Sequence, residues 1–218
     1  SSDLFINIFE NLQRYNKSKS GNIIIKYILT EENYKNKEID AFINLLIRFN
    51  LVNCDFEIST NYKFENLNIE KAFSIVYFYN TLRKAGAEFI HFDDHVRKRL
   101  YRTLKINIDK IDLEKNSLFE NLRKFFDQDI IVWGTGGYAN EIIKNSFLFK
   151  KSKVAFFVDS KINKSDDFFL NRHVLKPKEL LSTNKPIFIA SSTYWQTIYK
   201  KILKLGVNKN RVINTLVI

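Results

Sequence analysis

A glycine-rich stretch in the second half of the chain carries the clearest chemical signal. Gly134-Thr135-Gly136-Gly137-Tyr138-Ala139 matches the spacing G-x-G-x-x-A. In this spacing the first glycine allows a tight turn, the second lets the backbone approach a phosphate, and the alanine keeps the following helix close to its sheet. The N–H groups and the positive dipole end of that helix attract an anion. The spacing therefore predicts a phosphate cradle over residues 134–138.

Polar residues at the ends of later apolar runs are further candidates for the same ligand site. Asp159 ends the next run, 20 residues after Ala139, where a carboxylate accepts hydrogen bonds from ribose hydroxyls. Ser191 and Ser192 follow another run, and their hydroxyls either face the same ligand or cap the next helix. Lys161 is either a phosphate ligand or a solvated loop lysine. We therefore expect a nucleotide-type site that takes a small, phosphate-containing ligand.

The elements around these residues predict a Rossmann-like α/β domain over residues 129–218. The expected strands lie at 130–133, 154–158, 174–175, 187–190 and 212–217. The expected helices lie at 137–148, directly after Pro177, and at 193–205, where Gly206 ends the last one. Strands that alternate with helices of this length imply a parallel sheet.

The first half, residues 1–128, is expected to form a mainly helical domain with a small hairpin. Apolar residues at helical spacing predict helices at 3–15, 37–50, 69–84, 88–105 and 116–127. The run 23–29 fits a strand or a helix, and alternating apolar residues predict a hairpin over 51–64. A helix followed by a hairpin is the order of a winged-helix unit.

The charge distribution and the composition indicate which classes of protein fit this sequence. Residues 129–218 hold 15 Lys or Arg against 6 Asp or Glu, a balance of +9, whereas residues 1–128 hold 20 against 18, a balance of +2. A basic surface attracts phosphates, although general solubility explains it equally well. Cys54 is the only cysteine, which excludes an internal disulfide and fits a reducing cytoplasm. No apolar run approaches the roughly 18 residues of a membrane span.

The chain has no methionine and begins Ser-Ser-Asp. This start predicts a trimmed chain, so a neighbouring domain or a homo-oligomeric partner stays open as a contributor to the site.

Two weaker constellations lie in the first half. His91 and His95 stand at i, i+4, a spacing that chelates a metal on a helix, but no third ligand accompanies them. Asp93 and Asp94 fit caps of the following helix equally well, so we predict no metal site. The basic stretch 97–105 can follow a nucleic-acid backbone, yet a solvated helix face is the commoner explanation. No catalytic residue can be assigned from these patterns.

The second half resembles a known family. IIVWGTGGYANE at 130–141, VAFFVDS at 154–160, HVLKPKELL at 173–181 and PIFIASSTY at 186–194 are similar to the nucleotide-sugar-binding domain of bacterial sugar acetyltransferases. Similar modules also resemble the C-terminal halves of sugar methyltransferases and the front domains of nucleotide-sugar dehydratases. The resemblance implies that Gly134, Gly136, Gly137 and Asp159 line a nucleotide or nucleotide-sugar site. The hexapeptide repeats that carry the catalytic histidine of the acetyltransferases do not occur, so acetyl transfer is not implied.

Three functions fit these observations. We favour a protein of bacterial surface-carbohydrate biosynthesis or modification that binds a nucleotide or nucleotide sugar, with its role as part of a sugar-modifying transferase left open. A winged helix before a Rossmann-like domain instead resembles the Rex-type NADH-sensing repressors, although the charges of helix 37–50 cancel, unlike those of a DNA-reading helix. An NAD-dependent oxidoreductase also fits Asp159, but no Tyr-x-x-x-Lys pair accompanies the glycines.

Overall fold

The computed structural model describes residues 2–18, 21–61, 67–162, 167–191 and 194–217. The chain divides into two compact units, Ser1–Asp112 and Leu113–Ile218. The expected boundary at residue 128 therefore lies inside the second unit. Residues before Asp129 pack there because Asp127 N–H donates to Lys151 O at 2.8 Å and Ser152 Oγ donates to Phe125 O at 2.7 Å.

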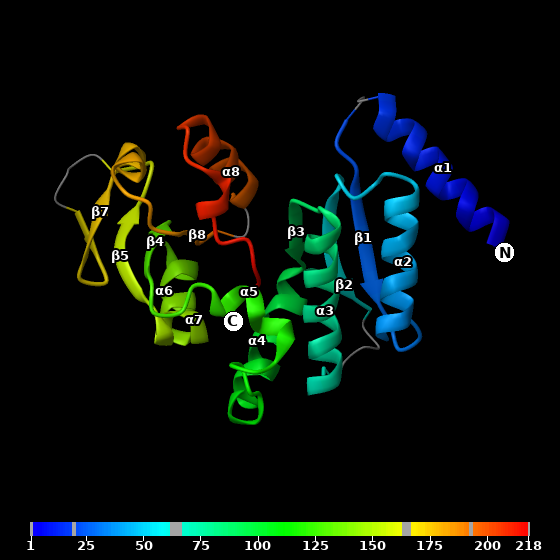
Figure 1. The fold of residues 1–218 in the computed structure, drawn as a ribbon, viewed down its shortest axis with the longest axis horizontal. Coiled ribbons are helices and arrows are strands. Elements are labelled where there is room, and N and C mark those ends of the chain that lie inside the picture. Colours follow the sequence, from blue (N-terminus) through cyan, green and yellow to red (C-terminus); the bar gives the residue numbers. More distant parts are fainter. Residues whose placement is uncertain (1, 19–20, 62–66, 163–166, 192–193, 218) are drawn as a thin grey trace. The chain divides into compact units, whose positions relative to one another are not determined.

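The first unit is a parallel sheet with helices around it. Its elements are α1 (Ser2–Ser18), β1 (Ile24–Leu29), α2 (Asn36–Arg48), β2 (Asp55–Thr60), α3 (Ile69–Ala85), β3 (Phe89–Phe92), α4 (Asp94–Ile106) and the 3₁₀ helix η1 (Ile108–Lys110). The strand order is β1-β2-β3, and both pairings are parallel (Figure 1). The residues 23–29, left open between strand and helix, thus form a strand.

The predicted hairpin, and with it the winged helix, is wrong. Strand β2 has β1 on one edge and β3 on the other, both parallel, so neither edge is left for an antiparallel arm. Residues 62–66, which include the predicted second arm, lie outside the described residues. The unit is mainly helical by residue count, as expected, but its core is a sheet. Tyr27 of β1 packs against Phe42 of α2 and Phe78 of α3, with ring centroids 4.6 Å away in each case.

The helix predicted over 88–105 is confirmed for residues 94–105 and wrong for the residues before them. Residues 89–92 form β3, and α4 begins only after Asp93, whose side chain accepts a hydrogen bond from His95 N–H at 2.8 Å. This cap separates strand from helix. His91 and His95 therefore stand on different elements, and the i, i+4 geometry does not exist.

The second unit contains the glycine stretch. Its elements are the 3₁₀ helix η2 (Ser117–Phe119), α5 (Glu120–Arg123), β4 (Asp129–Trp133), α6 (Gly137–Asn145), α7 (Phe147–Lys151), β5 (Lys153–Val158), β6 (Asp167–Phe169), β7 (Arg172–Leu175), η3 (Pro177–Ser182), β8 (Ile187–Ile189), α8 (Trp195–Lys204) and η4 (Lys209–Arg211). The helix expected over 116–127 is thus only η2 and α5. The helix expected over 137–148 is interrupted because Ser146 is extended and caps α7.

The sheet of this unit has the order β6-β7-β5-β4-β8 (Figure 1). All pairings are parallel except that of β6 with β7. The first strand of this unit, β4, is an interior strand between β5 and β8, and its residues Ile130 to Trp133 are at most 2% exposed, as expected for a strand buried on both faces. Because β5 lies on one side of β4 and β8 on the other, the sheet has a switch point at the carboxyl end of β4.

Two smaller expectations need correction. The run 212–217 is largely buried, but only Val212 forms a bridge, with Ile187, so no fifth parallel strand exists there among the described residues. An apolar run indicates burial and does not by itself specify a ladder. The helix after Pro177 is the 3₁₀ helix η3. Gly206 ends the region of α8 with φ of 83°, as expected for a helix stop.

Candidate functional site

Gly134 forms the turn at the carboxyl end of β4. Its φ is 117°, a conformation that side chains strongly disfavour, and its N–H donates to Val158 O at 2.8 Å. A Cβ at this position would lie 3.0 Å from Ala190 O, directly after β8. Both the conformation and the close approach of β4 to the end of β8 therefore require a glycine.

Gly136 and Gly137 are glycines for a different reason. Gly136 is the N-cap of α6 with φ of −85°, which any residue adopts, and it has no side chain to cap the helix. A Cβ on either residue would meet no described atom within 4 Å. The described residues thus leave open the space into which a side chain at Gly136 or Gly137 would project, and the positive dipole end of α6 lies at this turn. Ala139, fully buried, keeps α6 against the sheet as predicted.

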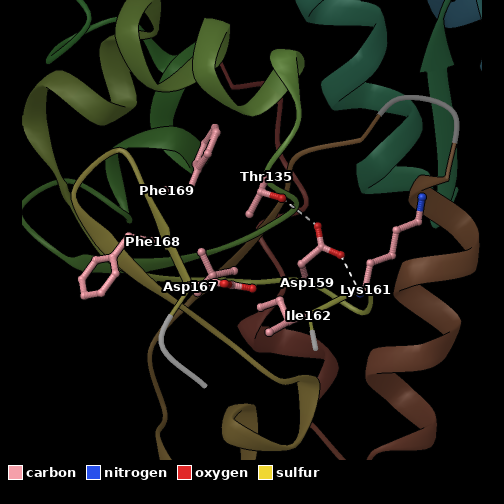
Figure 2. Close-up of a pocket in the computed structure, with 8 residues that line it drawn as sticks. Thr135, Asp159, Lys161, Ile162, Asp167, Phe168 and Phe169 are labelled. Atoms are coloured by element: carbon pink, nitrogen blue, oxygen red, sulfur yellow. Dashed lines mark hydrogen bonds between the residues drawn. The ribbon is translucent and has the colours of Figure 1, made fainter. Parts of the chain in front are cut away.

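Asp159 lies beside this turn. Thr135 Oγ1 donates to Asp159 Oδ2 at 2.9 Å, and Lys161 N–H donates to Asp159 Oδ1 at 2.9 Å (Figure 2). Each carboxylate oxygen accepts one hydrogen bond from the protein and retains capacity for another. The structure therefore joins the glycine turn and the acidic residue at one edge of the sheet.

A cavity of about 310 Å³ opens next to Asp159. Its lining residues are Thr135, Asp159, Lys161, Ile162, Asp167, Phe168, Phe169 and Val174 (Figure 2). The polar members Thr135 and Asp159 adjoin the glycine turn, whereas Phe169 and Val174, from β6 and β7, supply an apolar part. A cavity with an apolar part and a few convergent polar groups is typical of a small-molecule site.

Sequence reasoning missed β6 and its contribution to the cavity. Strands β6 and β7 are joined by Leu170 and Asn171, with φ of 48° and 59°. Two consecutive residues with positive φ are the signature of a tight hairpin turn, which usually contains glycine. Leu-Asn is an unusual pair for that turn, so only Asn171 offered a weak signal.

The remaining predicted site residues differ in their placement. Ser191 Oγ accepts a hydrogen bond from Tyr194 N–H at 3.0 Å in the turn before α8, whereas the N-cap of α8 is Tyr194 and has no side-chain capping hydrogen bond. Ser192 lies outside the described residues. Tyr138, in the first turn of α6, is half-buried and does not line the cavity. Lys161 lines the cavity, and its side chain extends away from the Asp159 carboxylate (Figure 2).

Lys201 of α8 lies at the same edge of the sheet, and no sequence pattern singled it out. Its Nζ donates to Ser160 Oγ at 2.9 Å and lies 5.9 Å from the centroid of the Trp133 ring. Ser160 directly follows Asp159, and Trp133 directly precedes Gly134. An ammonium group is therefore held at the same edge as the glycine turn, and only the packing of α8 reveals it.

The weaker constellations of the first half have structural roles. His91 Nε2 lies 3.2 Å from Glu57 Oε2, and Lys26 Nζ lies 2.7 Å from Glu57 Oε1, so the three side chains form a row across the sheet. The hydrogen bond from Lys26 lowers the pKa of Glu57 despite partial burial. In the described part of the chain, no group of three or more His, Cys, Asp or Glu is placed to hold a metal ion.

Cys54 and the basic helix α4 likewise show packing and surface roles. Cys54 is buried, and burial raises the pKa of its thiol, which disfavours the reactive thiolate. Arg97 Nη2 lies 2.9 Å from Asp94 Oδ1 on the same helix. None of the helices in the described residues combines the length and the apolar character needed to cross a bilayer.

One part of the chain is similar to a known protein family. Residues 126–213 match the model of the C2185-like, N-terminal family. No curated protein and no solved structure matches the chain at a significant level. The matched residues contain the whole five-stranded sheet, the glycine turn and Asp159. The site described above is thus part of a segment similar to the C2185-like, N-terminal family.

Proposed function

We propose that residues 113–218 bind a nucleoside phosphate, with a nucleotide sugar as the favoured class. The hydrogen bond from Thr135 to Asp159 carries this proposal. It joins the turn suited to a phosphate with the carboxylate suited to a ribose. Two predictions from separate parts of the sequence thus meet at one edge of the sheet, beside a cavity.

The ribose, the base and the phosphates of a nucleotide each have a matching group in the site. The ribose hydroxyls donate to Asp159, whose oxygens retain acceptor capacity. The base enters the apolar part of the cavity between Ile162, Phe169 and Val174. The phosphates bind at Gly136 and Gly137, where the backbone can be approached and α6 presents its N–H groups.

The role in bacterial surface-carbohydrate biosynthesis or modification rests on the resemblance of residues 130–194 to nucleotide-sugar-binding domains. We assign no reaction and no catalytic residue. Membership in a sugar-modifying transferase remains part of the proposal. The Rex-like alternative loses its main support, because the first unit has a parallel sheet in place of a winged helix. Asp159 still supports an NAD-dependent oxidoreductase, and the preferred ligand distinguishes that function from the proposed one.

A thermal-shift panel tests the proposal. The full chain is heated with NAD, NADH, NADP, ATP, S-adenosylmethionine, coenzyme A and UDP-, GDP- and CDP-sugars. We expect selective stabilisation by a nucleotide sugar, because ligands that bind only the folded state raise its stability. Selective stabilisation by NAD or NADH would transfer support to the oxidoreductase. Absence of any shift would contradict nucleotide binding by this chain.

A further inference from the structure

Among the described residues, Lys201 is a cation held in place without an anionic partner. It donates to the neutral hydroxyl of Ser160 and lies near the face of Trp133. Within the described residues it forms no ion pair, although it is solvent-exposed. An ammonium has three donors, so at least two remain available. The hydroxyl and the ring limit where the ammonium lies, and the cation–π attraction contributes to that placement.

The neighbouring cavity has two carboxylates in its lining, so a phosphate bound near it would be stabilised by a cation. Asp159 and Asp167 both line it, and their charges oppose a phosphate nearby. Asp159 receives its hydrogen bonds from a hydroxyl and a backbone N–H, neither of which neutralises it. Lys161 is the lysine of the cavity lining itself. Lys201 adds a second positive charge from α8, next to the residues that flank Asp159 and Gly134.

We infer that Lys201 is a phosphate ligand of the nucleotide site and that Ser160 and Trp133 position its ammonium. This inference rests on the proposed function and deepens it. The ligand class is a nucleoside diphosphate or its sugar ester, because Lys201 acts on the phosphate while Asp159 acts on the ribose. Lysine suits this role as a compact charge with rotatable donors, which can leave Ser160 to meet the ligand.

Matched pairs of ligands and variants test this role. The full-length chain is titrated with ADP, UDP, GDP and CDP, and the tightest of these is then compared with its nucleoside, which lacks the phosphates. Lys201→Gln removes the charge and keeps a polar side chain. Lys204→Gln removes an equal charge from the same helix at a residue for which the described part of the chain shows no hydrogen bond to Ser160 and no cation–π contact with Trp133. Lys201→Arg retains the charge, and circular dichroism checks that α8 persists in each variant.

We expect Lys201→Gln to weaken diphosphate binding about tenfold, as for loss of a charged hydrogen bond, while nucleoside binding stays within twofold. Lys204→Gln should bind the diphosphate within about twofold of wild type, and Lys201→Arg should retain most of the affinity. The difference between wild type and Lys201→Gln should shrink at high salt, because an exposed charge is screened.

The outcomes separate this inference from the function beneath it. If wild type binds a diphosphate and Lys201→Gln binds it equally well, Lys201 is not a ligand, while the nucleotide site stands. The same conclusion follows if Lys204→Gln weakens binding as much, or if Lys201→Gln weakens the nucleoside equally. If wild type binds none of the four diphosphates, nucleoside diphosphate binding itself fails, and the role of Lys201 fails with it.

Discussion

In each unit a turn follows the first strand, which among the described residues pairs only with parallel strands, and the two turns are built differently. After β1, the side chain of Asn33 forms hydrogen bonds with the backbone of the turn. Thr30 N–H donates to Asn33 Oδ1 at 2.8 Å, and Asn33 Nδ2 donates to Ile28 O at 3.0 Å. After β4, Gly134 turns the chain and the described residues leave the space in front of Gly136 open. A parallel edge thus becomes a candidate site only where the chain leaves its backbone groups accessible.

Strand order reinforces this difference. In the first unit the order β1-β2-β3 follows the chain, so successive connections proceed in one direction across the sheet. In the second unit β4 has β5 on one side and β8 on the other, so the strand order reverses beside it. Ligands in open α/β sheets bind at such reversals, because neighbouring connections leave in opposite directions and open a crevice.

Two carboxylates complete the comparison. Glu57 is paired with Lys26 and His91, two groups that carry or can carry positive charge. Among the described residues, Asp159 accepts hydrogen bonds from two neutral donors, Thr135 Oγ1 and Lys161 N–H. Glu57 therefore stabilises a sheet surface, whereas Asp159 forms no ion pair within the described part of the chain and lies beside a cavity. Substitutions of the two glycines and the two carboxylates test these differences between the units.

The largest effect is expected at Gly134. Gly134→Val should lower the free energy of unfolding by about 3 kcal/mol, because valine is strained at this positive φ and its Cβ would approach Ala190 O. Urea denaturation of the full chain measures it. Gly136→Ala is the matched control, and it should not destabilise the fold, since a Cβ there meets no described atom within 4 Å. Equal losses in both variants would mean that the two glycines do not differ as proposed.

Gly136→Val should affect binding and spare the fold. The added side chain projects into the space assigned to the phosphate, so we expect at least a hundredfold loss of affinity for the nucleotide found in the thermal-shift panel. The melting temperature without ligand should change little, because Gly136 has an ordinary φ. Isothermal titration calorimetry measures the affinity. Unchanged affinity would place the phosphate elsewhere.

Asp159→Asn should weaken binding about tenfold, the cost of replacing a charged acceptor by a neutral one. The asparagine can still accept from Thr135, so the turn is retained. A 2′-deoxy form of the same nucleotide should lose less affinity in this variant than in wild type, because the contact is already weakened. Glu57→Gln, in the other unit, is the control and should bind normally. An equal loss in both variants would indicate a nonspecific charge effect.

The smallest effect concerns the pH dependence of stability at Glu57. Its folded-state pKa is lowered, first by the hydrogen bond from Lys26. The stabilisation is therefore present above the unfolded-state pKa of about 4.3 and is lost as the pH falls through the folded-state value. We expect Glu57→Gln to reduce stability at pH 7 by less than about 1 kcal/mol and to match wild type more closely in acid. A constant difference from pH 7 to pH 2 would contradict this link.

Local patterns predicted much of the second unit and less of the first. The alternation of buried runs and helices correctly indicated β4, β5, β7, β8 and α8. In the first unit, residues 88–105 combined apolar and basic residues in a helical spacing, yet the strand β3 precedes Asp93. A short apolar run fits strand and helix equally, and its neighbours in the sheet decide between them. The hairpin failed for the same reason, since β1 and β3 occupy both edges of β2.

The sequence by itself determined the turn at Gly134, the start of α6 and the position of Asp159 at the end of β5. These features depend on contacts between residues close in the chain and on conformations that few residue types adopt. Only the tertiary structure decided that Thr135 meets Asp159 and that Lys201 reaches Ser160. The three basic residues Lys200, Lys201 and Lys204 are indistinguishable in the sequence. Strand order and helix packing separate them, because both arise from contacts between distant residues.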